Sequence, residues 1–154
     1  MNLKIPNSTF HIPHLNFLNW ILAIGVWGFL ESSCSNKDPK FQQYFAQGQV
    51  LYEKHCSNCH QKNGQGLGRL YPPVASSDYF IQNLNQSICL MKYGTEGKIL
   101  VNGKDYNKRM PGIPSLTELE LAEISTYIAN SWGVEKGMIE IATVKNALQV
   151  CIDK

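Results

Sequence analysis

The chain has 154 residues, of which 44% are hydrophobic and 17% are charged. This length and composition indicate one globular domain with at most a short appendage, and they exclude an intrinsically disordered chain. The formal net charge is only +2 and no run of Lys or Arg occurs, so we expect no nucleic-acid partner.

Residues 1–33 are expected to be an export signal. Residues 17–30 are apolar apart from Asn19. This stretch is too short for a membrane span of about 20 residues, but its length suits the hydrophobic part of a secretory signal.

Small residues before Cys34 are typical of a lipoprotein processing site, at which Cys34 would become the first residue and be acylated. The match is imperfect because Glu31 stands where an apolar residue is common. An uncleaved or differently cleaved signal and a buried cytosolic helix are the alternatives. The favoured interpretation places the protein on the periplasmic side, anchored to the membrane by lipid.

Residues 34–40 are predicted to be a polar tether, and residues 41–154 the folded domain. Residues 41–55 are predicted to form a helix, because apolar residues recur there at spacings of three and four. Gly48 lies inside this helix, where glycine costs about 1 kcal/mol relative to alanine. Such a glycine usually permits the close approach of another helix, although a tolerated surface glycine is the alternative.

The next motif is Cys56-Ser57-Asn58-Cys59-His60, a C-x-x-C-H sequence. Its two thiols can bond to the two vinyl groups of one haem, and His60 is then held where it can ligate the iron. A zinc site would need a second pair of ligands, and the other three cysteines stand singly. A thioredoxin-like redox pair would need a βαβ context that the flanking sequence does not suggest. The motif therefore favours haem c as the cofactor.

A glycine-rich loop follows at residues 61–68, and then Tyr71-Pro72-Pro73. A carbonyl group in this proline segment can accept a hydrogen bond from the far nitrogen of His60, which would fix the imidazole ring. A simple rigid turn is the alternative. Residues 78–84 and 86–93 are predicted to form two short helices.

Residues 99–106 are predicted to form a β-hairpin, because Asn102-Gly103 between two short extended runs is typical of a type I′ turn. We expect this insert to cover the haem edge. Met110 follows in a polar, proline-rich loop at residues 107–114, where its thioether can serve as a second axial ligand. Met91, in an apolar helix, and Met138, beyond the last firm helix, are the alternatives.

The last firm helix is predicted to begin with a capping box formed by Thr117 and Glu120. Its apolar face should pack against the Gly48 helix, and Gly133 should end it; the face comprises Leu121, Ile124, Tyr127, Ile128 and Trp132. An extension from about residue 135 is expected to contain one more short helix, at residues 141–150.

The cysteines can be divided by role. Cys34 is assigned to lipid and the C-x-x-C-H pair to haem, which leaves Cys89 and Cys151. In an oxidising compartment these two are expected to form a disulfide that pins the C-terminal tail. Two separate buried thiols are the alternative.

Taken in order, these motifs resemble the class I monohaem cytochromes c of bacteria over residues 41–134. The resemblance implies an all-α fold around one haem c, with a small β-hairpin insert before the axial methionine. It also implies roles for particular residues: thioether bonds at Cys56 and Cys59, axial ligation by His60 and Met110, and a Pro72 carbonyl that orients the histidine. One departure is residues 74–77, which stand where the family commonly has a glycine. The motifs that carry the resemblance are Gly48-x-x-x-Tyr52 before C-x-x-C-H, Tyr71-Pro72-Pro73-Val74, Val101-Asn102-Gly103, Met110-Pro111-Gly112, and Leu116-Thr117 through Trp132-Gly133.

The implied function is one-electron transfer to or from a respiratory membrane complex or a dehydrogenase. With both axial positions filled, we expect an electron-transfer protein and not an enzyme. One alternative is a five-coordinate haem sensor or peroxidase-like protein, for which Arg109 is the nearest suitable side chain. The other is a haem subunit fixed in an oxidoreductase complex, which has the same chemistry.

Overall fold

The computed structural model describes residues 38–152; the expected signal segment and Cys34 lie outside these residues. The fold is mostly helical with two small antiparallel sheets, which confirms the predicted all-α class with a hairpin insert. Within the described part of the chain, no helix is both long enough and apolar enough to cross a membrane. In chain order the elements are α2 (Pro39–His55), α3 (Ser57–His60), α4 (Asp78–Gln82), α5 (Leu84–Tyr93), β1 (Gly94–Thr95), β2 (Ile99–Val101), β3 (Lys104–Tyr106), β4 (Met110–Pro111), α6 (Glu118–Ala129) and α7 (Ile141–Ile152).

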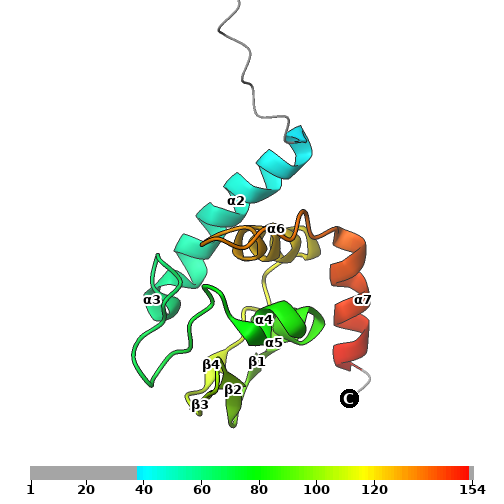
Figure 1. Cartoon of the computed structure of the whole chain (residues 1–154). Helices are drawn as coiled ribbons and strands as arrows, with labels where there is room; N and C mark the ends of the chain where they lie inside the picture. The colour runs from blue at the N-terminus through cyan, green and yellow to red at the C-terminus, as the bar shows by residue number, and fades with distance from the viewer. Residues whose placement is uncertain (1–37, 153–154) are drawn as a thin grey trace, which may run out of the picture. The chain divides into compact units, whose positions relative to one another are not determined.

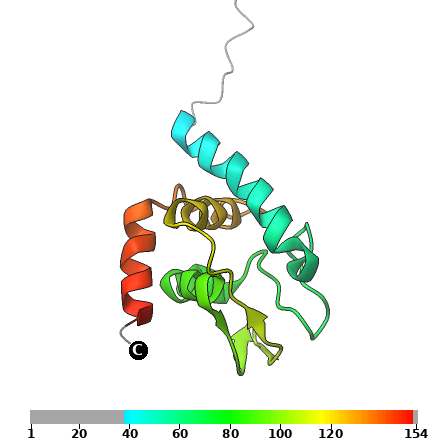
Figure 2. The same cartoon turned by 180° about the vertical axis from the view of Figure 1, so that it is seen from behind.

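Helix α2 crosses α6 at Gly48 (Figures 1 and 2). Gly48 is buried, and a Cβ atom at this position would collide with the carbonyl oxygen of Glu123 and lie 2.9 Å from Cβ of Tyr127. The glycine thus permits the close helix contact that the sequence predicted. Helix α2 begins earlier than expected, because the carboxylate of Asp38 caps it by accepting a hydrogen bond from the amide of Lys40 at 2.9 Å.

Helix α6 begins as predicted but ends earlier. The amide of Glu120 donates to Oγ1 of Thr117 at 3.2 Å, and the amide of Thr117 donates to the Glu120 carboxylate at 2.8 Å, which completes the capping box. The predicted end at Gly133 is wrong, because the helix stops at Ala129.

The cause of the early end is Asn130. Its side-chain amide donates to the carbonyls of Thr126 and Gly137, both at 2.7 Å, and its oxygen accepts from the amides of Lys136 and Gly137. These side-chain bonds compete with the helical ladder and turn the chain. Trp132 therefore lies beyond the helix.

The C-terminal extension forms α7, which packs against α5 and α6 and buries Val144 and Ala147 completely. The helix extends beyond the predicted residues 141–150, to Ile152. A disulfide joins Cys151 of α7 to Cys89 of α5. In both views α7 lies on the opposite side of the folded unit from α3 (Figures 1 and 2).

Replacing both Cys89 and Cys151 by serine should lower the free energy of unfolding. The bonded residues are 62 positions apart, and loop closure of that length corresponds to about 4 kcal/mol in the chain-entropy model. Denaturant unfolding of the haem-loaded protein measures the change, with thiol-reduced wild type as the control. An unchanged midpoint, or free thiols at both positions in mass mapping without reductant, would contradict the bridge.

Candidate haem site

One apolar cleft lies between the C-x-x-C-H segment and helix α5. Its space, including the solvent at its mouth, is about 580 Å³. A second, smaller hollow adjoins the cleft, since His60, Pro72, Ile99 and Met110 line both. Apolar side chains from four elements form most of its wall; among them are Phe80, Leu90, Met91, Ile99, Val101 and Ile128.

The C-x-x-C-H motif supplies one wall of the cleft. Cys56 follows α2 directly, and the short helix α3 is closed by the amide of His60, which donates to the Cys56 carbonyl at 2.9 Å. Buried Tyr52 fixes the exit from the motif, because its hydroxyl donates to the Gln61 carbonyl at 2.7 Å. Cys56 lines the larger hollow and Cys59 the smaller one.

His60 is buried, and its Nδ1 lies 2.9 Å from the carbonyl oxygen of Pro72. A carbonyl only accepts hydrogen bonds, so Nδ1 carries the proton and Nε2 keeps its lone pair. Burial lowers the pKa of His60, and the bond to Pro72 offsets only part of this effect. The imidazole is therefore neutral at neutral pH, with Nε2 free to bind a metal.

The proline segment is itself fixed. The amides of Val74 and Ala75 both donate to the Gly64 carbonyl, at 2.8 and 2.9 Å. The segment has no glycine after its prolines and turns instead at Ser76, whose φ is +50°. The position of the Pro72 carbonyl is thus determined by the glycine-rich loop.

Burial, and after it the neighbouring Cys59, raises the pKa of the Cys56 thiol to about 12. In the folded polypeptide this thiol is therefore protonated at neutral pH and is a poor nucleophile.

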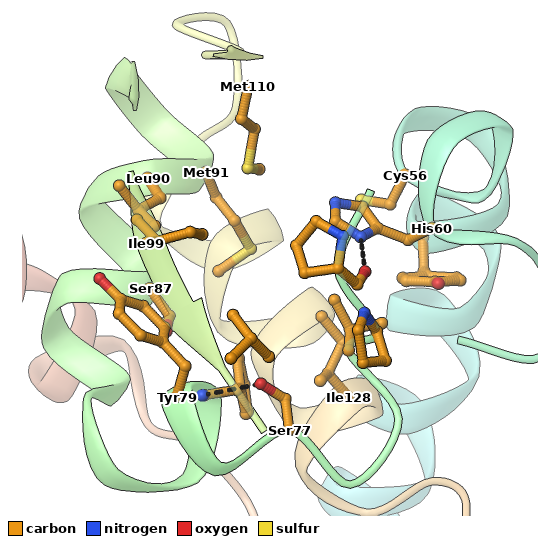
Figure 3. A pocket seen from close by; sticks show the side chains of 16 residues that line it. Cys56, His60, Ser77, Tyr79, Ser87, Leu90, Met91, Ile99, Met110 and Ile128 are labelled. Carbon is orange, nitrogen blue, oxygen red and sulfur yellow. Dashed lines mark hydrogen bonds between the residues drawn. The ribbon is translucent and has the colours of Figure 1, made fainter. Parts of the chain in front are cut away.

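Two methionines face this wall. Figure 3 shows Met110 and Met91 on one side of the cleft and Cys56 and His60 on the other. Met110 belongs to strand β4, which pairs with β1, so the prediction that residues 107–114 are all loop is wrong. Met91 comes from α5 and is only 6% exposed. Met138, the third methionine considered, packs against the core and is not among the residues that line the cleft.

The predicted hairpin is present and lies against the cleft. Asn102 and Gly103 have φ values of +48° and +72°, as a type I′ turn requires, and Ile99 and Val101 line the cleft. The turn is fastened to the start of α4: the amide of Asp78 donates to Oδ1 of Asn102 at 2.9 Å, and the amide of Asn102 donates to Oδ1 of Asp78 at 2.7 Å. No pattern in the sequence indicated this reciprocal contact.

Ser87 is a site residue that sequence reasoning missed. It lines the cleft from α5, and its hydroxyl is buried with no hydrogen-bond partner among residues 38–152. Ser87 precedes Met91 by four positions, so both lie on one helix face; that spacing could have indicated its place. An unpaired buried hydroxyl in an apolar cleft fits a ligand that brings its own polar groups.

The residues therefore fit a haem: two thiols and a neutral imidazole on one wall, two thioethers on the other, and apolar surroundings. An all-α fold with one such site defines the monohaem c-type cytochromes. The sequence profile of the family described as cytochrome c matches residues 45–132. The chain belongs to the cytochrome c family, in its class I, and its cofactor is covalently bound haem c.

Known proteins with similar sequences are also cytochromes c. A cytochrome c-552 of Thermus thermophilus is 34% identical over 95 residues, which cover 59% of this chain and 72% of that protein. A second Thermus thermophilus cytochrome c-552 is covered over 64% of its length. The cytochrome c subunit of a quinone alcohol dehydrogenase from Gluconacetobacter polyoxogenes is 30% identical over 89 residues, but the match covers only 19% of that subunit.

Two variants of Asn102 should separate its two roles. Asn102→Gly keeps the turn but removes the side-chain contact with Asp78, and should lower the free energy of unfolding by about 1 kcal/mol. Asn102→Ala loses the same contact, and alanine tolerates this positive φ less well than asparagine or glycine, so it should lower the free energy of unfolding by roughly a further 1 kcal/mol. Denaturant unfolding measures both, with Lys104→Ala, also on the hairpin, as the control. Equal effects of the two Asn102 variants would contradict the role of the turn.

Proposed function

We propose that this protein is a one-electron carrier whose single haem c is bonded to Cys56 and Cys59 and ligated by His60 and Met110. The observation that carries the proposal is the arrangement of these side chains across one apolar cleft. Haem c supplies one reversible Fe(III)/Fe(II) couple. The chain contributes the covalent attachment of the haem, its orientation and its apolar environment.

The orientation and the protonation state of His60 both favour it as a ligand. The hydrogen bond from Nδ1 to Pro72 fixes the ring and makes Nε2 more basic. Because burial keeps the imidazole neutral, no proton has to leave before Nε2 binds iron.

Met110 is the proposed partner on the opposite face. A neutral thioether ligand raises the reduction potential relative to a second histidine, and the apolar wall further disfavours the more highly charged ferric state. We prefer Met110 to Met91 because Met110 lies in the Met-Pro-Gly motif that resembles the family's axial ligand segment. Met91, in contrast, belongs to the buried core cluster.

The partners we propose are a respiratory membrane complex or a dehydrogenase. The cytochrome c-552 proteins are named as cytochromes alone and not as subunits of an enzyme, which favours a free carrier as the first candidate. Similarity to the cytochrome c subunit of a quinone alcohol dehydrogenase supports a haem subunit fixed in an oxidoreductase complex as the second candidate. The electron-transfer chemistry of the site is the same in both.

The five-coordinate alternative depends on Met110 being unligated and on a polar side chain near the iron. Arg109, the side chain considered for that role, lines the smaller hollow, but it forms an ion pair with Glu96 at 3.1 Å, and both side chains are exposed. This contact favours a surface role for Arg109 over one inside the cleft.

Replacing Met110 by alanine should lower the reduction potential by on the order of a hundred millivolts or more, because the axial ligands largely set the potential. The ferric methionine–iron charge-transfer band should disappear, and the ferrous protein should bind carbon monoxide. Redox titration and optical spectra measure these effects. Met91→Leu is the matched control and should keep both the band and the potential close to wild type; the reverse pattern would identify Met91 as the ligand.

We further propose export and lipid anchoring, on the strength of the apolar stretch at residues 17–30 and of Cys34. Incorporation of a fatty-acid analogue into the protein in a bacterial host should depend on Cys34, because acylation requires its thiol. The measurement is in-gel detection of the analogue in wild type and in Cys34→Ala, with Cys89→Ala as the control. Label that persists in Cys34→Ala would exclude this anchor.

A further inference from the structure

The segment that carries Met110 is attached to the C-terminal end of α5 through its backbone. Strand β4 pairs with β1, so that Met110 lies opposite Thr95. Two residues beyond β4, the amide of Ile113 donates to the carbonyl of Met91 at 3.0 Å. The position of the Met110 side chain therefore depends on how firmly residues 110–116 stay on α5.

Lys92 makes the other attachment. Its ammonium group donates to the carbonyl of Pro114 at 2.7 Å and to the carbonyl of Leu116 at 2.6 Å. Both carbonyls belong to the same segment, and Leu116 is only 2% exposed. Hydrogen bonds from a charged donor are roughly twice as strong as neutral ones, so one side chain holds the segment at two points.

Residues 110–116 also have little room to move closer to α5. A Cβ atom on Gly112 would collide with the backbone of Tyr93 and Gly94, and one on Gly94 with the backbone of Gly112. The segment is thus already as close to α5 as the backbones allow, and Lys92 opposes movement away. Helix α5 is held in turn on α7 by the disulfide at Cys89.

We propose that Lys92 is a positioning residue for the axial methionine: its two hydrogen bonds hold residues 110–116 so that the Met110 thioether stays directed into the cleft. This inference rests on the proposed ligation of iron by Met110. Lys92 is not among the residues that line the cleft or the smaller hollow, so it acts through residues 110–116.

Competition by imidazole tests the proposal at a single pH. Free imidazole binds ferric iron only in molecules whose methionine has dissociated, so its apparent affinity reports the dissociated fraction. In the haem-loaded protein, Lys92→Met should raise the apparent association constant of imidazole at least about tenfold, because two charged hydrogen bonds are lost. Lys92→Arg, which keeps charged donors, should stay within about threefold of wild type.

Lys104→Met is the matched control for charge. Lys104 is exposed on the hairpin that lies against the cleft and is not among the residues that line either hollow, so its removal changes the charge near the site without touching the Pro114 and Leu116 carbonyls. Its imidazole affinity should remain within about threefold of wild type. Equal effects of Lys104→Met and Lys92→Met would overturn the proposal in favour of a simple effect of charge.

The failures of the two proposals are distinguishable. If ferric wild type lacks the methionine–iron charge-transfer band, or if Met110→Ala keeps it, ligation by Met110 fails and the role of Lys92 fails with it. If the band is present and Lys92→Met leaves the imidazole affinity unchanged, only the role of Lys92 is overturned. Circular dichroism verifies folding; should Lys92→Met not fold, Lys92→Gln takes its place and is interpreted by the same criteria.

Discussion

The contact on which the structure depends is the crossing of α2 and α6 at Gly48. Because a Cβ atom there would collide with the backbone of Glu123, only glycine allows the two helices to reach this distance. Helix α2 leads directly into the cysteines and the histidine, while α6 carries Tyr127 against Tyr52, with ring centroids 5.4 Å apart. This one crossing thus positions both the C-x-x-C-H wall of the haem cleft and the aromatic core behind that wall.

The two walls of the cleft are built in different ways. The C-x-x-C-H wall is local in sequence, since its ligand and both thiols lie within five residues. The methionine wall is assembled from distant parts: α5 brings Met91 and Lys92, the strand pair β1–β4 places Met110, and α7 supports α5 from behind. The proposed axial methionine should therefore be more sensitive than the histidine to substitutions far from the cleft.

Features determined by local chemistry could be predicted from the sequence: the haem motif, the Asn102-Gly103 turn and the capping box at Thr117. The end of α6 could not be, because the side chain of Asn130 ends the helix through bonds to residues that come later in the chain. The short strand pairing at Met110 could not be predicted either. The same holds for the hydrogen bonds of Lys92, because tertiary packing determines which carbonyl groups lie within reach of its ammonium group. Ser87 was not recognised as a cleft residue because its only signal was the four-residue spacing from Met91, a residue whose apolar surroundings in the sequence favoured a place in the core.

The disulfide between Cys89 and Cys151 has a consequence for biogenesis. The chain needs one pair of cysteines oxidised and another pair reduced, since only thiols can bond to the vinyl groups of haem. Burial of Cys56 makes its thiol a poor nucleophile once the fold has closed. Haem attachment is therefore easier before the domain closes around Cys56 than afterwards. The remote bridge can form independently, because its two sulfurs lie on helices away from the cleft wall that contains the motif.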